Sequence, residues 1–131
     1  MTFLADTNVL GDLARPRPNA GVLAWAGQVR ELSVSVISFE EIQYGLAWKP
    51  NERIRSWFDR FLEEHCRVLP VTGDIARRAG ELRGRLRARG ETRSQADMLI
   101  ASTAIVHALT LVTRNVFDFK GCGATVLNPF V

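Results

Sequence analysis

The sequence predicts an α/β protein, in which helices cover both faces of a mostly parallel sheet in a three-layer α/β/α sandwich. Short apolar runs alternate along the chain with longer segments whose apolar residues recur at helical spacing. The 131 residues are 47% hydrophobic and 24% charged, a composition typical of a globular protein. A chain of this length can bury its own core, and we expect one domain over residues 1–131.

The strands are predicted from apolar or alternating runs that stop at polar or turn-forming residues. The first covers residues 2–5 and stops at Asp6. The second covers residues 32–37, alternates polar and apolar side chains, and ends at Ser38. Further extended segments are expected at residues 68–71, 109–113 and 124–127.

Helices are expected between the strands, with ends set by capping residues, prolines and glycines. The clearest is residues 51–65, because its large apolar side chains fall on one stripe and Pro50 precedes it. A second strong case ends at Gly90, a common helix stop. The expected helices cover residues 9–14, 19–30, 39–47, 51–65, 74–89 and 94–108.

Charge and cysteine usage exclude several classes of protein. The net charge is only +3, but 15 of the 17 basic residues are arginine, which either codon bias or phosphate recognition would explain. Cys66 and Cys122 lack the spacing of a zinc site or a disulfide framework. No apolar run has the length of a membrane span, and the first residues lack a basic leader, so we expect a cytoplasmic protein.

Four acidic residues stand where strands end or helices begin, the edge at which open α/β sheets carry function. They are Asp6, Glu41, Asp97 and Asp118. A structural role is the competing interpretation: Ser38 with Glu41, and Ser94 with Asp97, have the spacing of a capping box. Asp6 could likewise be a turn residue, and Asp118 a surface acid.

Capping does not explain why Asp6 and Asp97 adjoin strongly apolar segments. Buried carboxylates are costly unless they are protonated or bind a cation, and no basic residue lies within four positions of Asp6 or Glu41, whereas Arg114 is close to Asp118 in sequence. Several carboxylates from separate elements form a site suited to Mg²⁺ or Mn²⁺. Such a site binds phosphate oxygens and activates water for attack at phosphorus.

The sequence resembles PIN-domain nucleases at each of their four motifs. In the order of the motifs, the matching segments are residues 3–10, 36–45, 96–104 and 111–119. In the second motif, the glycine at position 45 selects Glu41 rather than Glu40 as the motif's acid. The fourth departs from some family members, in which the acid stands where this chain has Asn115 and not at Asp118. The resemblance implies that Asp6, Glu41, Asp97 and Asp118 bind the metal and act in catalysis. Residues assigned to orienting these acids or to contacting substrate are Thr7, Asn8, Ser38 and Asn115, although a plain turn role would also explain Thr7 and Asn8.

Within this family the sequence is similar to VapC-type toxins, and more narrowly to their FitB-like branch. The resemblance implies a metal-dependent endoribonuclease with Mg²⁺ or Mn²⁺ as cofactor and RNA as substrate. It also implies a homodimer neutralised by a small antitoxin, with tetramers as an alternative assembly and promoter DNA bound through the antitoxin. A second hypothesis is a catalytically inactive protein that acts only as a regulatory partner in such a DNA-binding complex; a small phosphatase is a weaker third.

A dense run of arginines lies between residues 77 and 93, with seven arginines and two glutamates. One interpretation is a solvated helix face in an arginine-rich protein. The other is a track for the RNA backbone that leads toward the acidic residues. The residues that we assign to this track are Arg85, Arg87 and Arg89.

Overall fold

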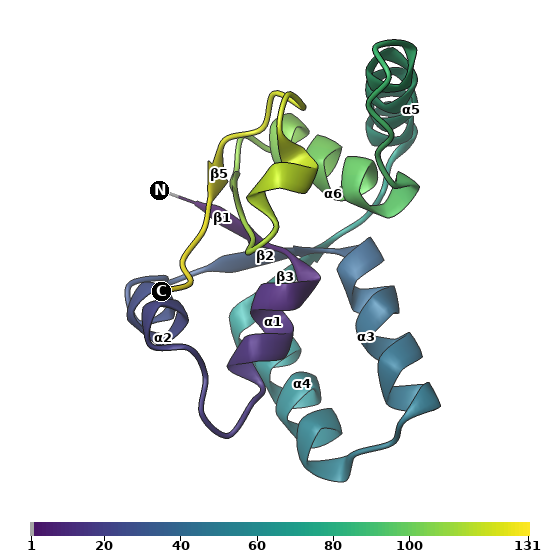
Figure 1. The fold of residues 1–131 in the computed structure, drawn as a ribbon. Coiled ribbons are helices and arrows are strands. Elements are labelled where there is room, and N and C mark those ends of the chain that lie inside the picture. The colour runs from purple at the N-terminus through teal and green to yellow at the C-terminus, as the bar shows by residue number, and fades with distance from the viewer. Residues whose placement is uncertain (1) are drawn as a thin grey trace.

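The computed structural model describes residues 2–131 and contains one five-stranded sheet whose strand pairs are all parallel. The strand order is β3-β2-β1-β4-β5, so the first strand lies at the centre (Figure 1). The strands are β1 (Phe3–Ala5), β2 (Leu32–Ser35), β3 (Cys66–Leu69), β4 (Thr110–Val112) and β5 (Val126–Leu127). The helices are α1 (Thr7–Leu13), α2 (Ala20–Ala26), α3 (Val36–Trp48), α4 (Glu52–His65), α5 (Gly73–Ala88), α6 (Gln95–Val106) and the short 3₁₀ helix η1 (Val116–Phe119).

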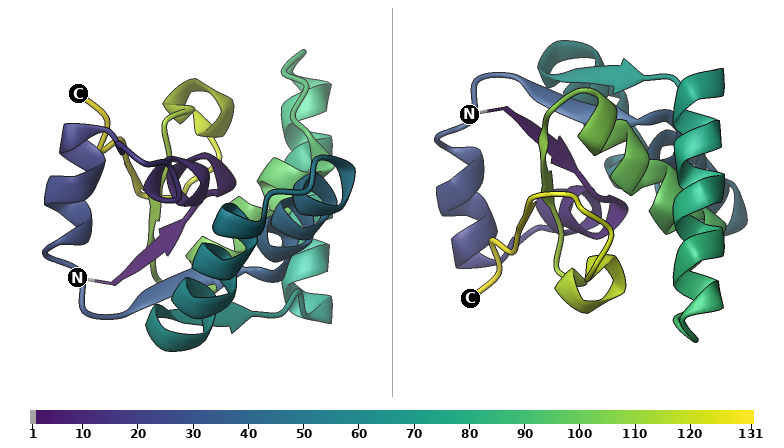
Figure 2. Two further views of the ribbon diagram at one scale, coloured as in Figure 1. Left: turned by 90° about the horizontal axis from the view of Figure 1, so that it is seen from below. Right: turned by 90° about the horizontal axis from the view of Figure 1, so that it is seen from above.

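The sheet separates two hydrophobic clusters, as the predicted three-layer sandwich requires. Successive side chains of a strand point to opposite faces, so Leu4 and Leu111 enter one cluster while Ala5 and Val112 enter the other. Helices α1 to α4 contribute to the cluster of Ala5, and α5, α6 and η1 to that of Leu4. Figure 2 shows the helices flanking the sheet from two further directions.

The second strand is shorter than predicted, and the helix after it begins earlier. Strand β2 ends at Ser35, whose hydroxyl oxygen accepts a hydrogen bond from the backbone N–H of Ile37 at 3.1 Å and caps α3. The alternation of polar and apolar residues continues to Val36 and therefore predicted a longer strand, but pairing with β3 stops at Ser35. Ser38 therefore lies inside the first turn of α3, and the predicted capping box of Ser38 and Glu41 is wrong.

Other helix ends differ from the predictions by a few residues. Helix α1 begins at Thr7 rather than residue 9, because Asp6 acts as its N-cap and accepts the Thr7 N–H at 2.8 Å. Asn19 caps α2 as predicted, but this helix ends at Ala26, four residues earlier than residue 30.

None of the helices found in residues 2–131 is both long and apolar enough to span a membrane.

The parallel sheet brings the starts of several helices to one edge. Strands β1 and β2 end directly before α1 and α3, and β4 ends shortly before η1. The residues that follow these strands therefore lie at the carboxyl edge of the sheet.

Candidate active site

Asp6 lies at the centre of this edge and is held by three hydrogen bonds. Its Oδ1 accepts the Thr7 backbone N–H, and its Oδ2 accepts the Asn8 amide at 3.1 Å and the Thr113 hydroxyl at 2.8 Å. Only 5% of the residue is exposed. Burial raises the pKa of the Asp6 carboxyl, with a further contribution from the charge of Glu41, while the hydrogen bonds oppose the shift. The carboxyl group is thus fixed in position, and it has no basic partner in residues 2–131.

Thr7 connects Asp6's helix to α3. Its hydroxyl donates a hydrogen bond to Glu41 Oε1 at 2.6 Å and lies 2.9 Å from Ser38 Oγ. Ser38 is fully buried, so this contact fixes the Thr7 side chain between two helices. The structure therefore places Thr7 and Ser38 beside Glu41, whereas the orienting role toward Asp6 is performed by Asn8 and by the Thr7 main chain.

Asp97 enters from the first turn of α6. Ser94 caps this helix by accepting the Asp97 backbone N–H at 3.0 Å, so the predicted cap is confirmed. Partial burial raises the pKa of the Asp97 carboxyl, and the negative charges of Asp6, Asp118 and Glu41 raise it further. This mutual repulsion reflects four carboxylates, from four separate elements, gathered at one edge. Capping explains the position of Ser94 but not this gathering.

Asp118 and Asn115, the two residues considered for the acid position of the fourth motif, both lie near the same edge but make different contacts. Asp118 lies exposed in η1 and contributes negative charge at Asp97. Asn115 is also exposed, and its backbone N–H donates to Thr113 Oγ1 at 3.1 Å. The main chain at Asn115 thus supports Thr113, while Asp118 contributes the carboxylate.

Sequence reasoning missed Thr113 as a functional residue. It is fully buried, donates to Asp6 and accepts hydrogen bonds from both Asn8 and Asn115. It joins the end of β4 to the end of β1 through side chains 107 positions apart. The available signal was a polar residue directly after the apolar run Leu111–Val112, the same pattern that identified Asp6.

The donor chemistry of this edge fits a hard divalent cation. In residues 2–131, none of the four carboxylates forms an ion pair with a basic side chain. Within the same residues, no three His, Cys, Asp or Glu side chains are close enough to enclose an ion by themselves. Mg²⁺ retains several waters and commonly takes only one or two carboxylates from the protein, so this open arrangement suits it.

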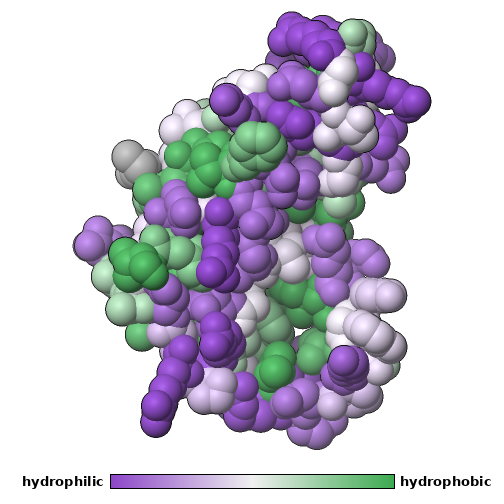
Figure 3. Space-filling view, viewed as in Figure 1, coloured by the Kyte–Doolittle hydropathy of each residue, from purple (hydrophilic) through white to green (hydrophobic). Residues whose placement is uncertain are grey.

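The predicted arginine track lies at the end of α5. Arg85 and Arg87 belong to its last turn and Arg89 follows as the C-cap, and all three are exposed. Arg85 lies 4.0 Å from Glu81, a solvent-exposed ion pair. Figure 3 shows a mostly hydrophilic surface over the region of α5. The helix therefore presents positive charge to solvent and contributes few apolar side chains there.

The chain is similar to known proteins over most of its length. The model of the PIN domain matches residues 3–117. VapC ribonuclease Y4jK of Sinorhizobium fredii is 33% identical, covering 98% of this chain and 97% of that protein. Toxin FitB of Neisseria gonorrhoeae is 30% identical over 98% of both proteins.

Solved structures agree with these relatives. The crystal structure of FitAcB from Neisseria gonorrhoeae matches with a TM-score of 0.84 and 30% identity, covering 98% of both chains. VapBC2 from Rickettsia felis, bound to a DNA fragment from its promoter, matches with a TM-score of 0.86 and 28% identity over the same shares. The parallel sheet, the four motifs and these similarities together show that the chain belongs to the PIN-domain family, alongside VapC and FitB.

Proposed function

We propose that this protein is the toxin of a toxin–antitoxin pair, formed by one catalytic domain over residues 1–131 that hydrolyses RNA phosphodiester bonds. The observation that carries the proposal is the gathering of Asp6, Glu41, Asp97 and Asp118 at the carboxyl edge of the sheet with no basic partner in residues 2–131. Relatives with about a third of their residues identical are named ribonucleases, which supports RNA as the substrate.

We assign Mg²⁺, with Mn²⁺ as the alternative ion, to Asp6, Asp97 and Asp118. One or two of these carboxylates would bind the ion directly and the rest would act through its bound waters, since no three of them converge on one point in residues 2–131. Bound there, the ion would lower the pKa of water and withdraw negative charge from the phosphoryl oxygens. Asp6 suits this role because Thr113 and Asn8 fix its carboxylate before substrate arrives, which avoids reorganisation during the reaction. We assign contact with substrate or with a water molecule to Asn115, whose exposure supports this role.

Glu41 is proposed as the general base, with metal binding as its alternative role. The Thr7 hydroxyl donates to Glu41 Oε1, so this oxygen is engaged and Oε2 is left to accept a proton. As the water oxygen bonds to phosphorus, Glu41 takes the water proton. The ester P–O bond on the opposite side then breaks, and the leaving oxygen is protonated by solvent.

The partners follow from the relatives. A similar structure from Klebsiella pneumoniae is a toxin–antitoxin complex, and VapBC2 was bound to a fragment of promoter DNA. We therefore propose a small antitoxin as partner, promoter binding through that antitoxin, and a cytoplasmic location. We also propose a homodimer: Tyr44 and Trp48 pair on the surface of α3, at 65% and 69% exposure, and self-association would bury them. Sedimentation of the protein with and without antitoxin measures both assemblies, including a tetramer.

The test of the catalytic proposal is Asp97→Asn, which preserves shape while it removes one charge. Cleavage of a single-stranded RNA by the purified protein should fall by at least about 10³-fold, and EDTA should abolish cleavage by the parent. Glu40→Gln is the matched control, because Glu40 is exposed and adjacent to Glu41 but is not the motif's acid. Undiminished cleavage by Asp97→Asn, or full cleavage in EDTA, contradicts the proposal. A parent that cleaves no RNA but binds promoter DNA with its antitoxin supports the regulatory alternative.

A further inference from the structure

Arg114 is an exposed cation fixed beside the acidic edge by its main chain. It directly follows Thr113, and its backbone N–H donates to Asn8 Oδ1 at 3.0 Å. Asn8 uses the nitrogen of the same amide to hold Asp6. The hydrogen bonds that orient the central carboxylate therefore also fix the position of the Arg114 backbone.

The Arg114 side chain is ordered by an aromatic ring and not by an acid. Its guanidinium carbon lies 5.0 Å from the centroid of the Phe130 ring, within the range of a cation–π contact. Within residues 2–131, no carboxylate lies within ion-pair distance of it, whereas Arg15, Arg78 and Arg85 each have an acidic partner. A cation–π contact orders a guanidinium without neutralising it, so the full charge is available to an anion from outside.

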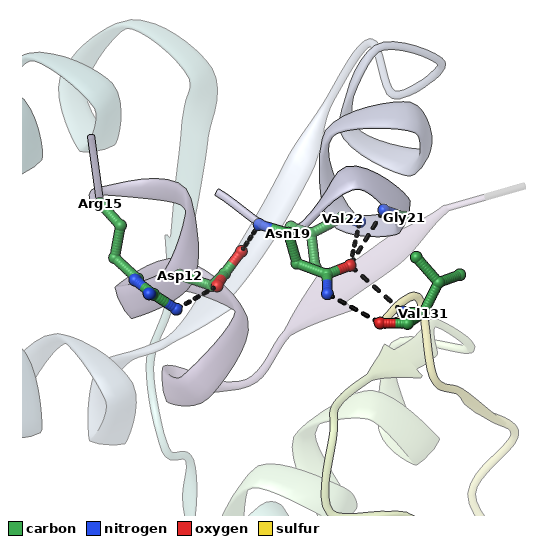
Figure 4. Close-up of polar contacts among 6 residues, drawn as sticks. All are labelled: Asp12, Arg15, Asn19, Gly21, Val22 and Val131. Atoms are coloured by element: carbon green, nitrogen blue, oxygen red, sulfur yellow. Dashed lines mark hydrogen bonds and ion pairs between the residues drawn. The ribbon is translucent and has the colours of Figure 1, made fainter. Parts of the chain in front are cut away.

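Phe130 is itself held firmly at the end of the chain. Its backbone N–H donates to Asn128 Oδ1 at 3.0 Å, and its ring packs against the cluster of Ala5. The next residue, Val131, is bound at both backbone groups by the Asn19 side chain: its N–H donates at 3.2 Å and its carbonyl accepts at 3.0 Å (Figure 4).

The amino end of α2 is shaped to receive this terminal segment. Asn19 also caps α2 through Gly21 and Val22, and a Cβ atom at Gly21 would overlap the carbonyl oxygen of Pro129. Asp12 accepts the Asn19 backbone N–H at 2.8 Å and fixes the cap in turn (Figure 4). The Phe130 ring, which is the platform under Arg114, therefore belongs to a segment that is hydrogen-bonded to α2 and, through Asp12, connected to α1.

We propose that Arg114 binds a phosphate of the RNA backbone next to the phosphate that is cleaved, and that Phe130 is its positioning residue. The inference rests on the proposed function, because it assumes that RNA reaches the acidic edge. A planar guanidinium matches phosphate geometry with two parallel hydrogen bonds, and a pre-ordered one loses less side-chain entropy on binding. Four carboxylates repel a polyanion, so a fixed cation at their rim also favours the approach of the strand.

The test compares Arg114→Met with Arg30→Met. Methionine retains the contact with an aromatic ring while it removes the charge. Arg30 is exposed and precedes β2 at the opposite, amino edge of the sheet, so it provides the same change of charge far from the acids. Binding of a fluorescent single-stranded RNA is measured in an Asp97→Asn background over a range of salt, and KM and kcat are measured in the parent background.

Arg114→Met should weaken RNA binding about tenfold and lower the slope of log Kd against log salt by ~0.7, the contribution of one phosphate contact on a single strand. KM should rise more than kcat falls, and Arg114→Lys should restore the salt slope. Phe130→Leu keeps the charge but removes the platform, so we expect a smaller loss of affinity with the slope retained. Melting temperatures identify any variant whose loss comes from unfolding.

If Arg114→Met and Arg30→Met have the same Kd and salt slope while the parent cleaves RNA, the role of Arg114 is overturned and the proposed function stands. If the parent neither binds nor cleaves RNA, both proposals fall together.

Discussion

The carboxyl edge of the sheet and the outer face of α5 both concentrate like charges, but they hold them differently. At the edge, Asp6 is 5% exposed and its carboxylate accepts hydrogen bonds from three residues that belong to two segments of the chain. On α5, the arginines come from one continuous stretch and are exposed, and Arg85 meets Glu81 only at 4.0 Å. Exposed pairs of this kind contribute about 0–1 kcal/mol.

This difference separates geometry from charge as sources of function. A carboxylate buried among fixed donors can present one oxygen at one point, which catalysis requires. A row of exposed arginines has no such fixed set of donors around it, but it can attract a polyanion from any direction, with an effect that salt screens. Substitutions at the edge should therefore change the reaction rate, and substitutions on α5 should change affinity.

Among residues that do not themselves belong to the four acids, the largest effect is expected at Thr113. In Thr113→Val the side chain keeps its size, but Asp6 loses the hydroxyl donor at 2.8 Å. We expect kcat/KM for RNA cleavage to fall about 10–100-fold, as for other residues that orient metal ligands. Melting temperatures separate this loss from the destabilisation caused by the lost hydrogen bonds. The matched control is Thr103→Val, another fully buried threonine, whose hydroxyl donates to the Leu99 carbonyl within α6. If Thr113→Val and Thr103→Val cleave RNA with the same kcat/KM, the hydrogen bond from Thr113 to Asp6 does not contribute to the reaction rate.

A smaller and salt-dependent effect is expected on α5. Replacing Arg85, Arg87 and Arg89 with alanine should weaken RNA binding about tenfold at low salt and lower the salt slope by about 2, because three phosphate contacts are lost. The control replaces Arg53, Arg55 and Arg60 of α4 with alanine, the same change of charge on another helix. If the α5 variant has the same salt slope of RNA binding as the parent, the three arginines do not form a track for RNA. If both triple variants lose the same RNA affinity, the loss comes from net charge alone.

The smallest effect is on stability without metal, and it concerns Asp97. Its pKa is raised above the ordinary 3.8 by burial and by its acidic neighbours, so the folded state takes up this proton more readily than the unfolded state. Stability therefore falls as pH rises from 3.8 through the raised pKa. We expect Asp97→Asn to raise the melting temperature at pH 7 by about 1–3 °C, and this gain to disappear below pH 4.

Adding Mg²⁺ to the same melting experiment tests whether Asp97 takes part in metal binding. Mg²⁺ should raise the melting temperature of the parent because it binds the folded state, and it should have little effect on Asp97→Asn. Glu40→Gln is again the control, since it removes an exposed acid outside the gathered set. Asp97→Asn melting below the parent at pH 7, or responding equally to Mg²⁺, would show that repulsion between the acids does not govern this edge.

Local sequence was sufficient to predict the alternation of strands and helices and several caps. Asn19 and Ser94 cap helices as predicted, because an amide or hydroxyl at a helix start can satisfy a free backbone N–H without help from the rest of the fold. Ser35 and Ser38 show the limit of this reasoning. Both can cap a helix, and the choice of Ser35 follows from where β2 stops pairing with β3, at the register of Ser35 with Leu69.

For the candidate site, the sequence alone determined which acids are present and that they follow strands or open helices. Only the tertiary structure decided that Thr113 holds Asp6, that Thr7 contacts Glu41, and that Phe130 lies under Arg114. The physical reason is the separation in sequence over which each kind of interaction acts. Capping and periodicity act within a few residues, whereas these contacts join positions 16 to 107 residues apart. They exist only because the parallel sheet aligns the carboxyl ends of β1 and β4 and places the end of the chain against α2.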